Sequence, residues 1–184
     1  GCAFLYEALK TLQEHGSHRP GRFLYGVDLD EDARRYLAPL FEAGANEDHF
    51  LTRDFLRVTP TCMPGAPFGV ICGNPPYIRP RLLGSRAVRV ACRAIEKAGF
   101  RISRRSSYWA YFLLHCLNFL RDGGCLAMIL PHAFLYSDYS RQLHRYLLGL
   151  FGSITIVSVD ELVFEEAQEK PLLLLAKGFR LRNE

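Results

Sequence analysis

Short apolar runs alternate with segments of helical period along most of this 184-residue chain, and few folds accommodate such an alternation. Apolar residues that recur every three or four positions predict helices at residues 3–14, 31–41, 107–120 and 137–150. Short apolar runs predict strands at residues 21–28, 48–52, 68–72, 125–130, 154–159 and 171–177. Helices between successive strands act as crossovers, so the pattern predicts an α/β fold with a mostly parallel sheet.

The last two predicted strands differ from the others, because only a loop at residues 160–170 separates them. They can therefore pair antiparallel, whereas the earlier strands are linked by crossovers. Arg121-Asp122-Gly123-Gly124 is expected to form a turn before the strand at 125–130, and Asp30 to cap the helix at 31–41. We expect a doubly wound sheet whose final strand is reversed.

Composition and residue patterns argue against a membrane protein, a secreted protein and a metalloprotein. A chain of 184 residues, 49% of them hydrophobic, is expected to form one domain over residues 1–184. No apolar stretch reaches the roughly 18 residues of a membrane span, and no signal pattern opens the chain, so a cytoplasmic protein is expected. The formal charge of +4 permits a nucleic-acid partner without requiring one. The six cysteines include no Cys-x-x-Cys pair and the six histidines show no metal-ligand spacing, which favours reduced thiols and no metal.

Acidic residues follow the first two predicted strands. Ligands of open α/β sheets bind beyond the carboxyl ends of the strands. Asp28 can accept hydrogen bonds from ribose hydroxyls there while Leu29 packs on a base. Asp54 and Phe55 can receive the exocyclic amine and one ring face of an adenine. Alternatively, Asp28 and Asp30 only initiate a helix, and Asp54 is a surface carboxylate beside a core aromatic.

The tetrapeptide Asn74-Pro75-Pro76-Tyr77 follows the predicted strand at 68–72. Each proline disfavours the helical region for the residue before it and removes a backbone donor, so the segment is extended, stiff and rich in acceptors. The Asn74 side-chain oxygen and the Pro75 carbonyl can both accept from one NH₂ group, and Tyr77 offers a flat face to the ring that carries it. A strand-ending turn with a core tyrosine is the alternative. The first reading predicts a site that activates a planar amine.

Residues 78–106 form one long segment without clear period, rich in arginine and beginning with Arg79 and Arg81. A short helix is possible near residues 88–98. A basic insertion directly after the stiff tetrapeptide can contact the phosphates of a nucleic acid, and the alternative is a solvated loop.

These motifs together resemble the S-adenosylmethionine-dependent amino-methyltransferases, most closely the TaqI-like, gamma-order adenine-N6 DNA methyltransferases of restriction-modification systems. Gly26-Val27-Asp28-Leu29-Asp30 is similar to the family's ribose motif, and Arg53-Asp54-Phe55-Leu56 to the motif beside the cofactor adenine. Asn74 to Tyr77 is similar to the catalytic motif. The resemblance continues through residues 107–112, 119–124 and 128–135, and it implies a Rossmann-like methyltransferase fold.

The resemblance also implies a cofactor, a substrate and roles for individual residues. S-adenosylmethionine is expected to bind at Gly1, Asp28, Leu29, Asp54 and Phe55. Double-stranded DNA is the expected substrate, with the methyl group transferred to an adenine extruded from the helix.

At the extruded base, the catalytic motif is expected to hold the amine at Asn74 and Pro75, with Pro76 stiffening the segment. Tyr77 and Phe164 are expected to stack on the two ring faces. Arg79 and Arg81 are expected to contact DNA; a loop aromatic packed on the sheet edge is the alternative for Phe164.

The chain also departs from the family pattern. It begins at Gly1-Cys2-Ala3, which resembles the tail of the glycine-rich first motif, so the first strand is expected to be missing and the chain to be a fragment. A target-recognition domain or specificity subunit is expected to supply sequence recognition. Methylation of a release-factor glutamine at N5, methylation of an RNA base, and a non-catalytic DNA-binding remnant remain as alternatives.

Overall fold

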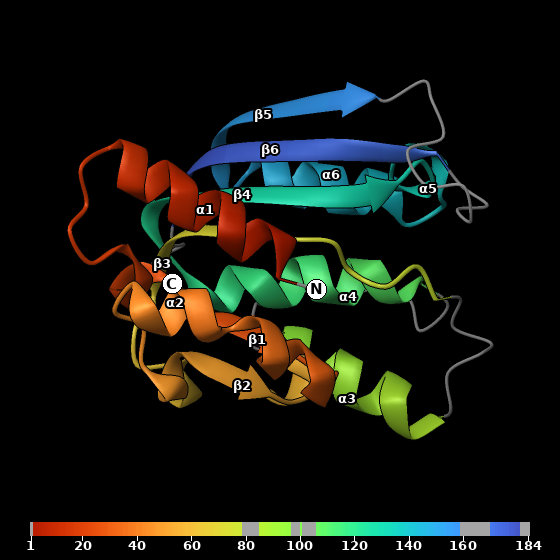
Figure 1. Cartoon of the computed structure of the whole chain (residues 1–184). Coiled ribbons are helices and arrows are strands. Elements are labelled where there is room, and N and C mark those ends of the chain that lie inside the picture. The colour runs from red at the N-terminus through yellow and green to blue at the C-terminus, as the bar shows by residue number, and fades with distance from the viewer. Residues whose placement is uncertain (1, 79–84, 97–99, 101–105, 159–169, 181–184) are drawn as a thin grey trace. The chain divides into compact units, whose positions relative to one another are not determined.

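A computed structural model describes residues 2–78, 85–96, 100, 106–158 and 170–180 of the chain (Figure 1). The chain divides into two compact units, an N-terminal unit of residues Gly1–Ala66 and a C-terminal unit of residues Pro67–Glu184.

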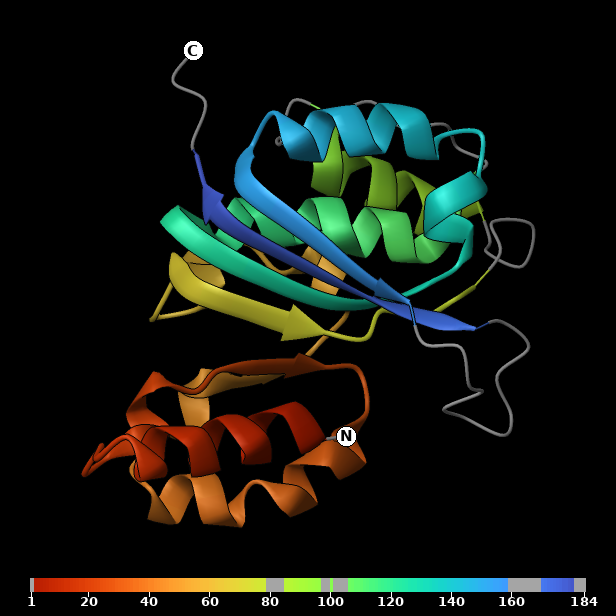
Figure 2. The same ribbon diagram turned by 90° about the horizontal axis from the view of Figure 1, so that it is seen from above.

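Two short parallel strands and two helices make up the regular structure of the N-terminal unit. The elements are α1 (Ala3–Glu14), β1 (Gly26–Asp28), α2 (Ala38–Glu42) and β2 (Phe50–Thr52). Single 3₁₀ turns link them, namely η1 (Pro20–Phe23), η2 (Glu31–Tyr36), η3 (Glu47–His49), η4 (Phe55–Arg57) and η5 (Pro60–Cys62). Gly26 pairs with Phe50 and Asp28 with Thr52, so the carboxyl ends of both strands lie at one edge. Figure 2 shows α1 and α2 on the same side of this two-stranded sheet.

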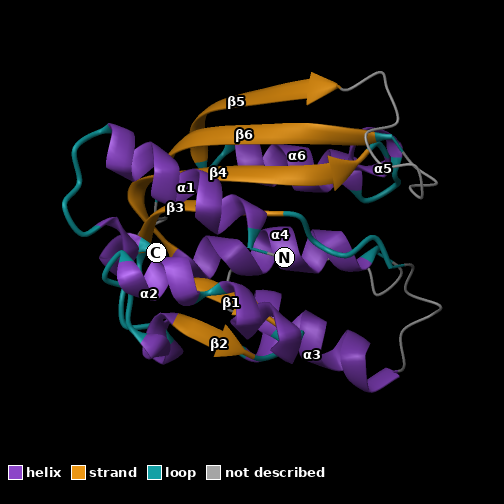
Figure 3. Cartoon of the chain, in the orientation of Figure 1, coloured by secondary structure: helices purple, strands orange, loops and turns teal. Residues whose placement is uncertain are grey.

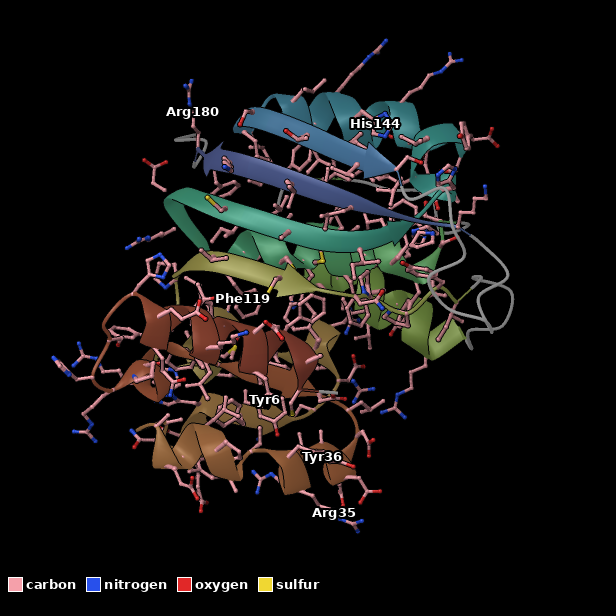
Figure 4. The ribbon with its side chains drawn as sticks, turned by 45° about the horizontal axis from the view of Figure 1, so that its top comes forward. Tyr6, Arg35, Tyr36, Phe119, His144 and Arg180 are labelled. Atoms are coloured by element: carbon pink, nitrogen blue, oxygen red, sulfur yellow. The ribbon has the colours of Figure 1, made fainter. Side chains whose placement is uncertain are left out.

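Leucine and aromatic side chains fill the core of the N-terminal unit. Leu9 of α1, Leu40 of α2 and Phe50 of β2 belong to one buried cluster. The Tyr6 hydroxyl donates a hydrogen bond to the Tyr36 carbonyl, and Figure 4 shows both side chains. Helix α1 is thereby fixed to the end of η2.

The expected helix at 31–41 is wrong in detail, because it divides into η2 and α2 at Leu37. Pro39 has no N–H with which to continue the hydrogen-bond ladder, and it occupies the first turn of α2, where none is required. The predicted cap is confirmed: Asp30 Oδ1 accepts from the Asp32 N–H at 2.9 Å. The predicted strand at 21–28 is shorter than expected, since Pro20–Phe23 forms η1 instead.

Four strands with helices on one face form the C-terminal unit. The strands are β3 (Phe68–Gly73), β4 (Leu120–Pro131), β5 (Phe151–Ser158) and β6 (Pro171–Phe179). The helices are α3 (Ser85–Glu96), α4 (Tyr108–Cys116), the 3₁₀ turn η7 (Leu117–Phe119), α5 (Ala133–Tyr136) and α6 (Ser140–Leu148). Figure 3 shows these elements by type, and Figure 2 shows α4 and α6 on the same face of the sheet.

Strand order in this sheet is β3-β4-β6-β5. Strands β3 and β4 are parallel, and β6 runs antiparallel to both β4 and β5. The predicted reversal of the final strand is confirmed. The sequence predicted a single sheet. The described residues form two, because β1 and β2 pair with each other and with no strand of the four-stranded sheet. No described strand corresponds to the first strand of the resemblance.

The predicted turn at residues 121–124 is wrong, because these residues belong to the first part of β4. Pairing with β3 jumps from Phe68–Leu120 to Val70–Cys125, so four residues of β4 bulge opposite Gly69 alone. Gly123 has a φ of +74°, which accounts for the glycine pair that looked like a turn signal.

Helix α4 contributes several large side chains to the core of the C-terminal unit. Trp109, Tyr111, Leu113 and Leu114 are each no more than 1% exposed. The predicted helix at 107–120 is confirmed over this stretch, with Leu120 already in the strand. A helix so completely buried gives β3 and β4 a fixed support, and the ends of those strands are thereby held in place.

Candidate active site

Two acidic residues lie at the carboxyl edge of the N-terminal sheet. Asp28 is the last residue of β1, and Asp54 lies two residues beyond the end of β2. The Arg53 N–H donates to the Asp28 carbonyl at 2.8 Å, which joins the two strand ends directly. The predicted ribose and adenine motifs are therefore brought to the same edge.

Asp28 is exposed and held by the turn that follows it. The Asp30 N–H donates to Asp28 Oδ1 at 3.1 Å, which orients the carboxylate. The adjacent Leu29 side chain is 74% exposed, an unusual amount for a leucine. An oriented carboxylate beside open apolar surface matches the hydroxyls and flat base of a nucleoside.

Asp54 is half-buried, and both of its carboxylate oxygens have protein partners. Oδ1 accepts from the Leu56 N–H at 3.1 Å and so caps η4, a role that the sequence analysis did not predict for this residue. Oδ2 lies 3.4 Å from Arg57 Nε, a pairing that the sequence analysis did not predict. Each carboxylate oxygen can accept more than one hydrogen bond, so an amine can still bind beside these contacts. Phe55 is half-buried at the start of η4.

The tetrapeptide 74–77 continues directly from β3. Gly73, the last residue of β3, pairs with Met128 of β4, so the strand positions the segment up to Asn74. Asn74 is exposed, Pro75 is buried and Pro76 is half-buried, while Tyr77 is 36% exposed. The Tyr108 N–H donates to the Ile78 carbonyl at 3.0 Å, which anchors the far end of the segment to α4. Both ends are fixed, and the prolines stiffen what lies between.

Asn74 follows the exposed side of β3. Successive side chains of a strand alternate between faces, and Val70, Cys72 and Asn74 are all exposed, Val70 at 67%. The Cys72 side chain is exposed, yet the protein atoms around its sulfur still desolvate it and raise the pKa of the thiol. A thiol protonated at neutral pH is a poor nucleophile, so Asn74 is the better candidate on this face.

Four of the predicted site residues lie outside the described part of the chain. They are Gly1, Arg79, Arg81 and Phe164.

A polar cluster at the end of β4 was not predicted by the sequence analysis, which found no metal-ligand spacing among the histidines. His132 Nε2 lies 3.0 Å from the Ser158 hydroxyl, and the Tyr136 hydroxyl lies 3.3 Å from His132 Nδ1. The i, i+4 spacing of His132 and Tyr136 was visible in the sequence, but Ser158 comes from β5, and only the fold reveals this contact.

Among the residues that the structure describes, no three histidine, cysteine or acidic side chains gather as a metal would require. None of the described helices is both long and apolar enough to cross a membrane.

The fold is that of the class I S-adenosylmethionine-dependent methyltransferases. A Listeria monocytogenes protein described as such a methyltransferase superposes on 95% of this chain and 50% of its own, with a TM-score of 0.66 and 18% identity. A type I restriction-modification methyltransferase subunit from Streptococcus thermophilus superposes on 92% of this chain and 36% of its own, with a TM-score of 0.68 and 19% identity.

Residues 41–164 match the Eco57I restriction-modification methylase family, and the chain belongs to that family. It is also 25% identical over 118 residues to the type II methyltransferase M.AccI of Acinetobacter calcoaceticus, a match that spans 63% of this chain. That match covers 21% of the curated relative's length.

Proposed function

We propose that the chain is the catalytic part of a DNA methyltransferase that modifies the N6 amine of adenine within a restriction-modification system. Support comes from the family and from the segment at the end of β3. The single observation that carries the proposal is that Asn74 is exposed on a backbone fixed at Gly73 and Ile78 and stiffened by two prolines.

The acceptor side chains at the carboxyl edge of the N-terminal sheet suit the nucleoside part of S-adenosylmethionine. Asp28 would accept from the ribose hydroxyls, and the exposed Leu29 would cover the adenine of the cofactor. Asp54 would accept from the exocyclic amine of that adenine, with Phe55 beside its ring. Gly1 would contact the cofactor as well, by the family resemblance.

When bound, the cofactor supplies a methyl group attached to a positively charged sulfur, and the sulfur would leave with the electron pair of the S–C bond. The chain's own contribution is to the amine. The Asn74 side-chain oxygen and the Pro75 carbonyl would each accept one of its two N–H bonds. Acceptors placed for a tetrahedral nitrogen localise the lone pair that attacks the methyl carbon, and the surplus proton then leaves to water.

The base itself would be held by aromatic stacking. Tyr77, 36% exposed, would cover one face of the extruded adenine and Phe164 the other. Stacking on protein rings offsets part of the few kcal/mol needed to remove a base from the duplex. Arg79 and Arg81 would contact the phosphates beside it.

Sequence recognition would come from a partner surface. The matched structures include a type I methyltransferase subunit, which belongs to a multi-subunit system by its name. We propose a target-recognition domain or a specificity subunit as the corresponding partner here.

Replacing Asn74 tests the role that carries the proposal. In the intact protein, Asn74→Ala should lower the rate of methyl transfer about 10²- to 10³-fold, the effect typical of one transition-state hydrogen bond, with cofactor affinity unchanged. Asn74→Asp keeps an acceptor oxygen and should retain more activity than Asn74→Ala. The control is Asn46→Ala, at an exposed asparagine whose side chain makes no capping bond to η3. Equal loss of transfer and cofactor binding in Asn74→Ala would show that the role is wrong.

A further inference from the structure

Helix α3 presents a row of arginines on one side. Arg86, Arg89 and Arg93 are spaced three and four residues apart, which places them on one face of a helix, and all three are exposed. The sequence alone predicted only a short helix near 88–98 within a basic segment. The structure starts the helix at Ser85, so that all three arginines belong to it.

The opposite face of α3 is fixed to the core. Ala91 and Ile95 are 0% and 2% exposed. The Ala94 carbonyl accepts from Asn118 Nδ2 at 3.2 Å, and it lies 3.3 Å from His115 Nδ1 of α4. Because α3 is held by both apolar packing and hydrogen bonds, its arginine face has a fixed orientation within the C-terminal unit.

The charge on this face is not compensated within the described part of the chain. None of the three arginines forms an ion pair with another described residue. The first turn of α3 contains no acidic residue, and Arg86 stands instead near the helix end that favours anions. Glu96, at the last position, is the one acidic residue in the helix sequence. Like charges at these spacings destabilise a free helix, and an anionic partner bound to the row would relieve that repulsion.

We propose that this arginine row is a docking face for the phosphodiester backbone of duplex DNA. The inference rests on the proposed function, which makes DNA the substrate. Arg86 and Arg93 are seven residues apart, or roughly 10 Å along a helix axis. Successive phosphates of one strand lie about 3.4 Å apart along the duplex axis, so three long side chains can reach neighbouring phosphates. The guanidinium fork binds phosphate oxygens in pairs, and such contacts add affinity without reading sequence.

The test is the salt dependence of DNA binding by the intact protein. Each phosphate contact contributes about 0.9 to the slope of log affinity against log salt concentration. R89Q/R93Q should therefore lower the slope by about 1.8, so that between 50 and 200 mM salt the variant loses roughly 12-fold less affinity than the wild type. The matched control is R141Q/R145Q, which removes two exposed arginines at the same spacing from α6 and should leave the slope unchanged.

Two further comparisons keep the result clear. R89K/R93K preserves the charge and should restore the slope, and far-ultraviolet circular dichroism should show unchanged helix content in every variant. Equal slopes for R89Q/R93Q and R141Q/R145Q, or wild-type binding that does not depend on salt, would overturn the inference. If the wild type methylates adenine in DNA while these slopes are equal, only the docking face is wrong; a slope that falls as predicted without methylation would reject the function alone.

Discussion

The two acidic side chains proposed to bind the cofactor lie at strand ends, and their surroundings differ. Asp28 is exposed and its carboxylate accepts from the Asp30 backbone N–H, and the half-buried Asp54 caps η4 and pairs with Arg57. Under the proposed function, a ligand at Asp54 would share that carboxylate with Arg57. The Arg57 and Asp54 side chains are 54% and 29% exposed, so water screens this ion pair. Because Asp28 is the more exposed of the two carboxylates, we expect it to contribute more to recognition of the cofactor.

Removing the Asp28 carboxylate should weaken cofactor binding strongly. Hydrogen bonds to a charged group contribute about 1.5–3 kcal/mol, so Asp28→Ala should raise the Kd for S-adenosylmethionine roughly 10- to 150-fold by isothermal titration calorimetry. Asp32→Ala is the control, since Asp32 is exposed and pairs with Arg35 in the same turn. Figure 4 labels Arg35. A Kd that changes equally in both variants would mean that Asp28 has no special role.

Local residue chemistry was predictable where it depends on near neighbours in the chain. The Asp30 cap could be predicted because Asp30 directly precedes a helical segment. The positions of Asp28 and Asp54 at the strand ends could be predicted because each comes at the end of a short apolar run. The contact of His132 with Ser158 depends on β5 returning to the sheet, and no short-range pattern encodes it.

Among the elements, β4 contains two adjacent glycines that allow the strand to bulge. Gly123 adopts a left-handed conformation inside a bulge, and Gly124 lies so close to the Arg121 carbonyl oxygen that a Cβ would be 2.8 Å from it. The same Gly-Gly pair typically marks a turn, so the sequence alone favoured the wrong element. The period of apolar residues predicted other elements well, since α1 spans the predicted residues 3–14.

Gly123→Ala should destabilise the C-terminal unit by about 1 kcal/mol, because a φ of +74° is strained for a residue with a Cβ although nothing lies within 4 Å of it. Urea unfolding followed by fluorescence of Trp109, the single tryptophan of the chain, reports on this unit. Gly152→Ala in β5 is the control, since its Cβ would meet only backbone atoms at 3.7–3.8 Å and stability should stay within about 0.5 kcal/mol. A larger loss in Gly152→Ala than in Gly123→Ala would contradict the bulge geometry.

For the molecule as a whole, strand order and direction were predicted only in part. The reversed β6 followed from a connection too short for a crossover, but pairing partners depend on hydrogen bonds between distant segments. The described residues therefore form a two-stranded and a four-stranded sheet where the pattern predicted one. The family match assigns the chain to the Eco57I restriction-modification methylase family, and the modified atom of the substrate is the central proposal.

The direct test incubates the intact protein with methyl-labelled S-adenosylmethionine and unmethylated duplex DNA, then digests the DNA to nucleosides, with parallel RNA and release-factor reactions. Label in N6-methyldeoxyadenosine is the predicted result, and it would identify the substrate and the modified atom together. Label only in RNA or protein, or no label despite measurable cofactor binding, would contradict the account.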